Sequence, residues 1–300
     1  GVRLRAMLPT WLPHDEAATG GYEDGQMARL TSLSGRTLDR YLKPVRKAAG
    51  IKGRSGTTPG SLLKTQIPLR TGLWNEAEPG FMEADTVAHC GDDIAGKFAW
   101  SVTMTDICTG WTECRAIWGK LATEVRDQIL AMDAAIPFTL KGLDVDNGSE
   151  FINYTLLKCI TDHPEHPAFT RSRPYEKNDN AHIEQKNWTH VRKLFGYIRI
   201  ENRESIALMN DLYTNEVSWM NNFFKPNAKL ISRVRNGAKV TRVYDQPQTP
   251  LERLAIIADG KNPNVTALQD LAKTLNPFEL QLTIKRKLKV IKDMNKKPTE

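Results

Sequence analysis

Hydrophobic and polar positions in the middle of the chain follow two different periods. Residues 98–107 alternate between apolar and polar side chains, which is typical of half-buried β-strands, and residues 81–90 are also strand-like. Residues 121–135 instead repeat apolar side chains at helical spacing. The pattern predicts strands 81–90, 98–107 and 111–118, helix 121–135, strand 138–146, helix 151–160, strand 168–173, and helices 179–195 and 205–223. This order predicts an α/β fold with a mixed five-stranded sheet covered by helices on both faces, within a core domain over residues 79–224.

The pattern before this core predicts a pair of short helices. One covers residues 27–33, and Ser34 is placed to cap a second helix that extends to about residue 49. Pro44 is expected to kink or end that second helix. Basic side chains lie along the second helix: Arg36, Arg40 and Lys43. Residues 1–50 therefore predict a helix-turn-helix that contacts DNA, and the Gly- and Pro-containing residues 51–78 predict a linker.

The pattern after the core predicts a small basic β module over residues 225–260. Two β-rich runs, 229–235 and 238–244, flank Asn236-Gly237, the residue pair preferred in tight hairpin turns. That turn would place Arg235 opposite Ala238 and Ile231 opposite Arg242. Three arginines would then share one face as candidate DNA ligands: Arg233, Arg235 and Arg242. Residues 261–300 are expected to form a basic tail, as a helix or a strand with a frayed end.

Composition and charge narrow the class of protein. The chain has 300 residues, 40% of them hydrophobic, and a chain of this length is expected to form several domains. It lacks an apolar run long enough to cross a membrane. We therefore expect a cytoplasmic protein with reduced cysteines. It begins at Gly1 without a Met, and we expect a fragment of a longer protein. Net charge is +5 over residues 1–80, −4 over 81–200 and +6 over 201–300. An acidic centre between basic flanks favours a metal site beside polyanion-binding regions.

Three carboxylates are candidates for that metal site. Asp85 lies within a predicted strand, Asp146 ends another just before a turn, and Glu184 lies on a predicted helix after 37 intervening residues. Carboxylates brought together in this way repel one another and suit Mg²⁺, which takes hard oxygen ligands. Asp144 remains an alternative to Asp146, because both would point to the same face of the strand.

Together these motifs resemble a known family. Asp85, the run Asp146-Asn147-Gly148-Ser149-Glu150-Phe151 and Glu184 resemble the catalytic triad of the retroviral-integrase-like DDE transposases. Residues 171–184 (RSRPYEKNDNAHIE) resemble the segment before the last glutamate in bacterial insertion-sequence transposases. The resemblance covers residues 81–200 and implies a ribonuclease-H-like core.

The resemblance also implies an activity and its partners. Asp85, Asp146 and Glu184 would ligate two Mg²⁺ ions, which Mn²⁺ can replace, to nick transposon ends and join the freed 3′-hydroxyl to target DNA. It further implies a homo-oligomer on double-stranded DNA in a nucleoid-associated bacterial protein. Near Glu184, three side chains are candidates for holding DNA: Arg173, Lys177 and Asn180. The alternatives are a ribonuclease-H-like nuclease without joining activity and a DNA-binding derivative that has lost catalysis.

Overall fold

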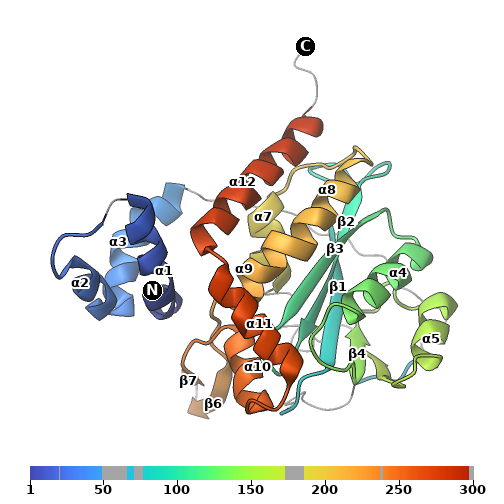
Figure 1. Ribbon diagram of the computed structural model, residues 1–300. Coiled ribbons are helices and arrows are strands. Elements are labelled where there is room, and N and C mark those ends of the chain that lie inside the picture. The colour runs from blue at the N-terminus through green and yellow to red at the C-terminus, as the bar shows by residue number, and fades with distance from the viewer. Residues whose placement is uncertain (20, 49–65, 71–76, 173–185, 237–238, 297–300) are drawn as a thin grey trace. The chain divides into compact units, whose positions relative to one another are not determined.

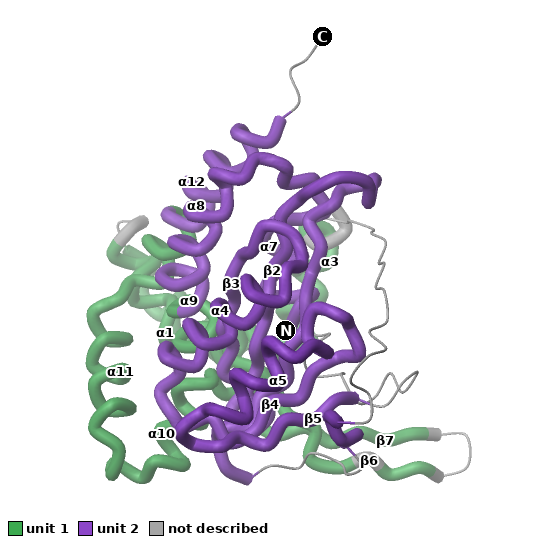
Figure 2. The backbone as a smooth tube through the Cα atoms, turned by 90° about the vertical axis from the view of Figure 1, so that its right-hand side faces the viewer, with its two compact units in different colours: residues 1–51, 219–282 green, residues 52–218, 283–300 purple. Residues whose placement is uncertain are grey.

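The computed structural model describes residues 1–19, 21–48, 66–70, 77–172, 186–236 and 239–296. The predicted site residues Glu184, Arg173, Lys177 and Asn180 lie outside these ranges. The chain divides into two compact units, shown in two colours in Figure 2. The first unit combines residues 1–51 with 219–282, and the second combines 52–218 with 283–300. Among the described helices, none is both long and apolar enough to cross a membrane.

The second unit is built on a five-stranded sheet with the order β3-β2-β1-β4-β5 (Figure 1). Its strands are β1 (Phe81–Ala88), β2 (Ala99–Asp106), β3 (Thr112–Trp118), β4 (Gly142–Val145) and β5 (Ala168–Arg171). The first three strands pair antiparallel, whereas β4 pairs parallel with both β1 and β5. This order and these directions are those of the ribonuclease-H-like fold, so the predicted fold class is confirmed.

Helices cover both faces of this sheet, as the sequence predicts. The two crossover helices lie on one face, and the helices after β5 lie on the other (Figure 1). The first set is α4 (Ala122–Asp133) and α5 (Tyr154–Thr161), and the second is η1 (Asn187–Arg192), α7 (Lys193–Phe195), α8 (Ser205–Leu212) and η2 (Tyr213–Val217). The η segments are wider π-helical turns within otherwise α-helical stretches. The strand predicted over 138–146 is shorter than expected, because pairing begins only at Gly142.

The core of the second unit is apolar but includes a buried chain of polar side chains. His89 Nε2 and the Tyr213 hydroxyl each lie 2.7 Å from Ser101 Oγ, and none of the three side chains is exposed. Burial lowers the pKa of His89 to about 3, so its imidazole is neutral. The hydrogen bonds connect β2 to η2 across the sheet–helix interface, which fixes the register of the helix on the sheet.

The first unit contains three helices at the N-terminus: α1 (Val2–Thr19), α2 (Gln26–Ser32) and α3 (Gly35–Ala48). Helix α1 is not among the predicted elements. It includes Pro9 and Pro13, and proline normally argues against a helix interior. The predicted cap is confirmed, because the Thr37 amide donates to Ser34 Oγ at 3.1 Å. Pro44 does not end α3, which continues to Ala48. The other expectation, a kink at Pro44, stays a prediction.

The predicted hairpin is confirmed, but its register differs by two residues. Strands β6 (Leu230–Asn236) and β7 (Lys239–Tyr244) place Arg235 opposite Val240 and Arg233 opposite Arg242. Asn236 is the last residue of β6 and pairs with Lys239, rather than forming the turn. A shift of two residues preserves the alternation of faces, so the three arginine positions still lie on one side of the ribbon.

The C-terminal residues are more helical than expected. After α9 (Ser218–Phe223) and the hairpin, the chain continues through α10 (Pro250–Ala258), α11 (Pro263–Thr274) and α12 (Pro277–Met294). Thr249 forms a capping box with Glu252 at the start of α10, and Asn262 caps α11. The predicted tail over 261–300 therefore contains two helices.

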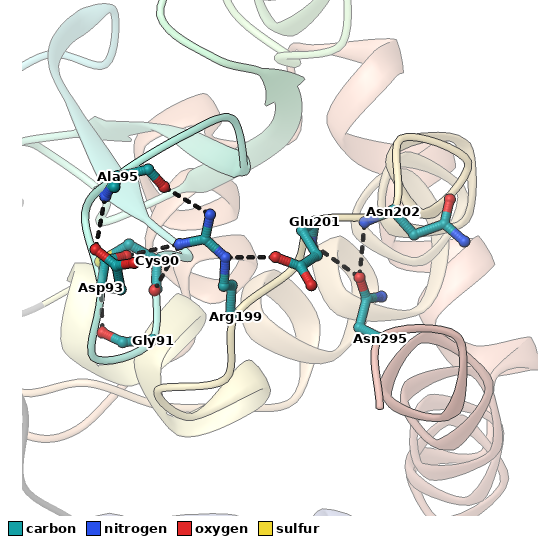
Figure 3. A network of polar contacts seen from close by, with 8 residues as sticks. All are labelled: Cys90, Gly91, Asp93, Ala95, Arg199, Glu201, Asn202 and Asn295. Atoms are coloured by element: carbon teal, nitrogen blue, oxygen red, sulfur yellow. Dashed lines mark hydrogen bonds and ion pairs between the residues drawn. The ribbon is translucent and has the colours of Figure 1, made fainter. Parts of the chain in front are cut away.

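A polar network within the second unit connects segments that lie far apart in the sequence (Figure 3). Arg199 donates to the backbone carbonyls of Asp93 and Ala95, each at 2.7 Å, and to the Glu201 carboxylate at 2.6 Å. Asn295, just after α12, accepts the backbone amide of Glu201 at 2.9 Å. One arginine and one asparagine thus hold together the β1–β2 loop, the segment before α8 and the end of α12.

A buried ion cluster joins the predicted linker to the sheet. Leu69 forms a parallel bridge with Arg171 of β5, which places the next side chain, Arg70, over the sheet. Arg70 Nη1 lies 3.1 Å from Glu83 and 3.2 Å from Asp144, and all three side chains are buried. Part of the linker predicted over 51–78 therefore completes the core at this edge.

We expect Arg70→Met to destabilise the protein by about 3–5 kcal/mol, because it leaves two buried carboxylates without their cation. Denaturant unfolding monitored by circular dichroism measures the change in the free energy of unfolding. Lys141→Met is the control, since Lys141 pairs with Glu78 at the surface and such pairs contribute at most about 1 kcal/mol. Equal destabilisation in both variants would contradict the assigned role of Arg70.

Candidate metal centre

Asp85 lies in the middle of β1, with its carboxylate held by two donors. The Thr86 amide donates to Oδ1 at 2.7 Å, and Asn187 Nδ2 donates to Oδ2 at 2.6 Å. Asn187 is the first residue of η1, so this π-helical segment lies beside Asp85. π-Helical turns of this kind occur frequently at functional sites.

Asp146 follows β4 directly and starts a tight turn. Its Oδ1 accepts the Gly148 amide at 2.9 Å, which closes the turn on its own side chain. Because Ala84 pairs with Val145 in the parallel ladder, Asp85 and Asp146 occupy the next positions on neighbouring strands. The structure therefore brings these two predicted residues together.

The turn after Asp146 is anchored from the edge of the sheet. Asn147 donates to the Ser172 carbonyl at 2.9 Å and accepts from Arg171 Nη1 at 3.1 Å. Arg171 Nε also donates to the Ile67 carbonyl at 3.0 Å. Arg171 thus connects the docked linker segment to the turn that carries Asp146.

Asp144, the alternative to Asp146, has a different environment. Its carboxylate accepts from Thr170 Oγ1 at 2.5 Å and pairs with Arg70, and the residue is 1% exposed. Asp144 is part of the buried ion cluster with Glu83, and both carboxylates are in direct contact with Arg70. These contacts favour Asp146 as the residue available to a ligand.

Glu150 is a carboxylate at this centre that the sequence analysis did not include among the site residues. It is 2% exposed, and its Oε1 accepts from Thr86 Oγ1 at 2.9 Å and from Lys120 Nζ at 2.5 Å. The Lys120 ammonium also lies 4.1 Å from the centre of the Trp100 ring. The sequence offered one clue, which is that Glu150 follows Asp146 by four residues. Glu150 was overlooked because an acidic side chain in a turn ordinarily faces water.

The electrostatics of the centre reflect crowding of like charges. Burial, together with the negative charge of Asp146, raises the pKa of Asp85 to about 8. Burial and the charge of Glu150 raise the pKa of Asp146 to about 6. The positive charge of Lys120 opposes both shifts without cancelling them. The centre therefore favours added positive charge, either protons or a cation.

Two buried oxygen atoms at this centre accept no hydrogen bond from the described residues. They are Glu150 Oε2 and Asn187 Oδ1. A methyl group on Gly148 would lie 2.7 Å from Glu150 Oε2 and 2.8 Å from Asp146 Oδ1, so both oxygens flank the same backbone. Unpaired oxygen acceptors among carboxylates fit the ligand preference of Mg²⁺. Within the described ranges, however, no three His, Cys, Asp or Glu side chains are grouped closely enough to hold a metal ion.

Five of the predicted DNA-binding side chains lie at the surface of the first unit, and the side chain of Arg233 lies outside what the structure describes. Arg36, Arg40 and Lys43 are exposed on α3. Arg235 and Arg242 are exposed on the hairpin.

The metal-free protein should lose stability as pH rises. Because the pKa values of Asp85 and Asp146 are higher than the ordinary aspartate value, the folded chain holds protons that the unfolded chain releases. The stabilisation that these bound protons give the folded state is complete below the pKa of an aspartate in the unfolded chain, about 4. It is lost as pH rises through about 8. In the presence of a chelator, the melting temperature should therefore fall less between about pH 5 and pH 8 for Asp85→Asn than for the wild type. Equal slopes would contradict the assigned crowding of charge.

Comparison with solved structures finds retroviral integrase cores. The catalytic core domain of HTLV-2 integrase, in a dimeric form with magnesium, has a TM-score of 0.37 at 14% identity, over 50% of this chain and 90% of that one. The catalytic core domain of BIV integrase has a TM-score of 0.39 at 14% identity, over 61% of this chain and 97% of that one.

Comparison by sequence identifies a relative. No family model matches the chain. The protein y4rM of Sinorhizobium fredii (strain NBRC 101917 / NGR234), described as uncharacterized, is 37% identical over 257 residues, which cover 84% of this chain and 71% of that protein. Identity at this level over most of both chains establishes common descent, and the chain therefore belongs to the family of y4rM.

Proposed function

We propose that the protein is a metal-dependent DNA transposase or integrase of the DDE type. It nicks the ends of a mobile element and joins the freed 3′-hydroxyl to target DNA. The observation that carries the proposal is the adjacency of Asp85 and Asp146 on parallel strands, with their negative charge only partly compensated. A divalent cation relieves this repulsion and is the group that phosphoryl transfer requires.

Glu184 is the third carboxylate of the proposed site. It precedes Asn187 by three residues, so covalent geometry limits the distance between their Cα atoms to about 11 Å. Asn187 donates to Asp85. The chain therefore has a carboxylate within reach of the pair formed by Asp85 and Asp146.

The proposed chemistry assigns separate tasks to these side chains. Asp85, Asp146 and Glu184 hold two Mg²⁺ or Mn²⁺ ions, which would activate the attacking oxygen and stabilise the leaving oxygen of an in-line displacement. Asn187 and the Gly148 amide orient the two aspartates through the hydrogen bonds described above. The attacking oxygen belongs to water in nicking and to a DNA 3′-hydroxyl in joining, so one site suffices for both steps.

The basic surfaces of the first unit support double-stranded DNA as the substrate. Exposed Arg36, Arg40 and Lys43 lie on α3, which we assign as the helix that reads the element's ends. We assign the hairpin arginines and the segment with Arg173, Lys177 and Asn180 to contacts with the DNA backbone. Joining two ends of an element requires at least two copies of the chain, so we propose a homo-oligomer on DNA.

We expect Glu184→Gln to bind element-end DNA like the wild type and to lose Mg²⁺-dependent nicking by at least about 100-fold, because electrostatic stabilisation of the transition state depends on the metal. Gel-shift and oligonucleotide cleavage assays measure the two properties. Glu78→Gln, which changes an exposed carboxylate of the same unit, is the control and should nick normally. Full nicking by Glu184→Gln would exclude Glu184 from the site.

We expect the double substitution Arg36→Ala and Arg40→Ala to weaken binding to the element ends. The slope of the logarithm of affinity against the logarithm of salt concentration should become shallower by about 0.9 for each DNA phosphate that an arginine no longer neutralises. Titrations at several salt concentrations measure both effects. Replacing Lys261 and Lys273 by alanine removes two exposed cations of the same unit and is the matched control. Unchanged affinity in the arginine variant would show that α3 does not read the ends.

A further inference from the structure

We propose that Glu150 is an additional ligand of the metal centre and that Lys120 is the cation it exchanges for the metal. The inference rests on the proposed function, because it concerns the same site. It extends the set of ligands beyond the three carboxylates of the triad.

The two oxygens of Glu150 have different surroundings. Oε1 accepts from Thr86 and Lys120, whereas Oε2 is buried and accepts no hydrogen bond from the described residues. Oε2 is the atom on the side of Asp146, because a Cβ added at Gly148 would lie 2.7 Å from Oε2 and 2.8 Å from Asp146 Oδ1. A buried carboxylate oxygen that lacks a donor is costly unless a cation or proton joins it. Oε2 is therefore positioned to bind a cation shared with Asp146.

Charge balance identifies the class of ligand. When ionised, Asp85, Asp146 and Glu150 carry three negative charges, and Lys120 is the cation that interacts with all three. Because the metal takes the place of Lys120, it meets the full charge of the three carboxylates, which a divalent cation compensates better than a single ammonium does.

Lys120 has an alternative position once a metal replaces it. Its ammonium already lies over the Trp100 ring, and its side chain is 23% exposed, so it reaches solvent without unfolding its surroundings. A lysine released beside the metal centre would place a positive charge where a DNA phosphate arrives. Lys120 thus neutralises Glu150 while the metal is absent, and metal binding releases Lys120 from Glu150.

Mn²⁺ binding to the full chain tests the inference, with isothermal titration calorimetry as the measurement. We expect Glu150→Gln to raise the Kd for Mn²⁺ at least about 10-fold, because it removes one charged ligand. Lys120→Met should lower the Kd, because the competing ammonium is absent. Glu78→Gln is the matched control and should bind like the wild type. Circular dichroism confirms that each variant is folded.

The outcomes separate this inference from the proposed function. If the wild type binds Mn²⁺, Asp85→Asn does not, and Glu150→Gln binds like the wild type, Glu150 is not a ligand and only this inference fails. If the wild type binds no Mn²⁺, the proposed function fails and this inference fails with it. If Glu150→Gln does not fold, the Lys120→Met variant decides the question. A Kd for Mn²⁺ that is unchanged or raised in Lys120→Met overturns the proposed exchange of Lys120 for the metal.

Discussion

The parallel pairing of β1 with β4 is the constraint on which the site depends. It places Glu83 beside Asp144 within the ladder, and Asp85 and Asp146 at the next positions along the same two strands. The sheet therefore carries two pairs of carboxylates at neighbouring levels. Each pair would be strongly repulsive without a compensating positive charge.

The two pairs are compensated in different ways. Arg70 lies within 3.2 Å of both members of the inner pair, so its positive charge offsets their repulsion through direct contacts inside the protein, and the cluster contributes to the fold. The outer pair has Asn187 and the more distant Lys120, which leave net negative charge. The pair formed by Glu83 and Asp144 thus supports the core, whereas the pair formed by Asp85 and Asp146 favours binding of a cation.

The linker is part of this arrangement. Arg70 compensates the inner pair from the segment over residues 66–70, and Arg171 holds both the Ile67 carbonyl and the Asn147 side chain. Docking of this segment therefore stabilises the turn that carries Asp146. Sequence reasoning identified the segment only as a linker, because its structural role depends on contacts with residues about one hundred positions away.

The sequence alone determined the order of strands and helices in the core, since alternating and helical periods are local properties of the chain. It also predicted the hairpin and the cap at Ser34. Local rules failed at two places: α1 accommodates two prolines, and the hairpin pairs two residues away from the expected register. The motifs identified Asp85 and Asp146 as candidates but left Asp144 as an alternative. Asp144 and Asp146 point to the same face of the strand, and the sequence does not show which side chains contact each of them. Only the tertiary structure assigned Asp144 to Arg70 and placed Glu150 and Lys120 beside the pair, because those contacts join residues far apart in the chain.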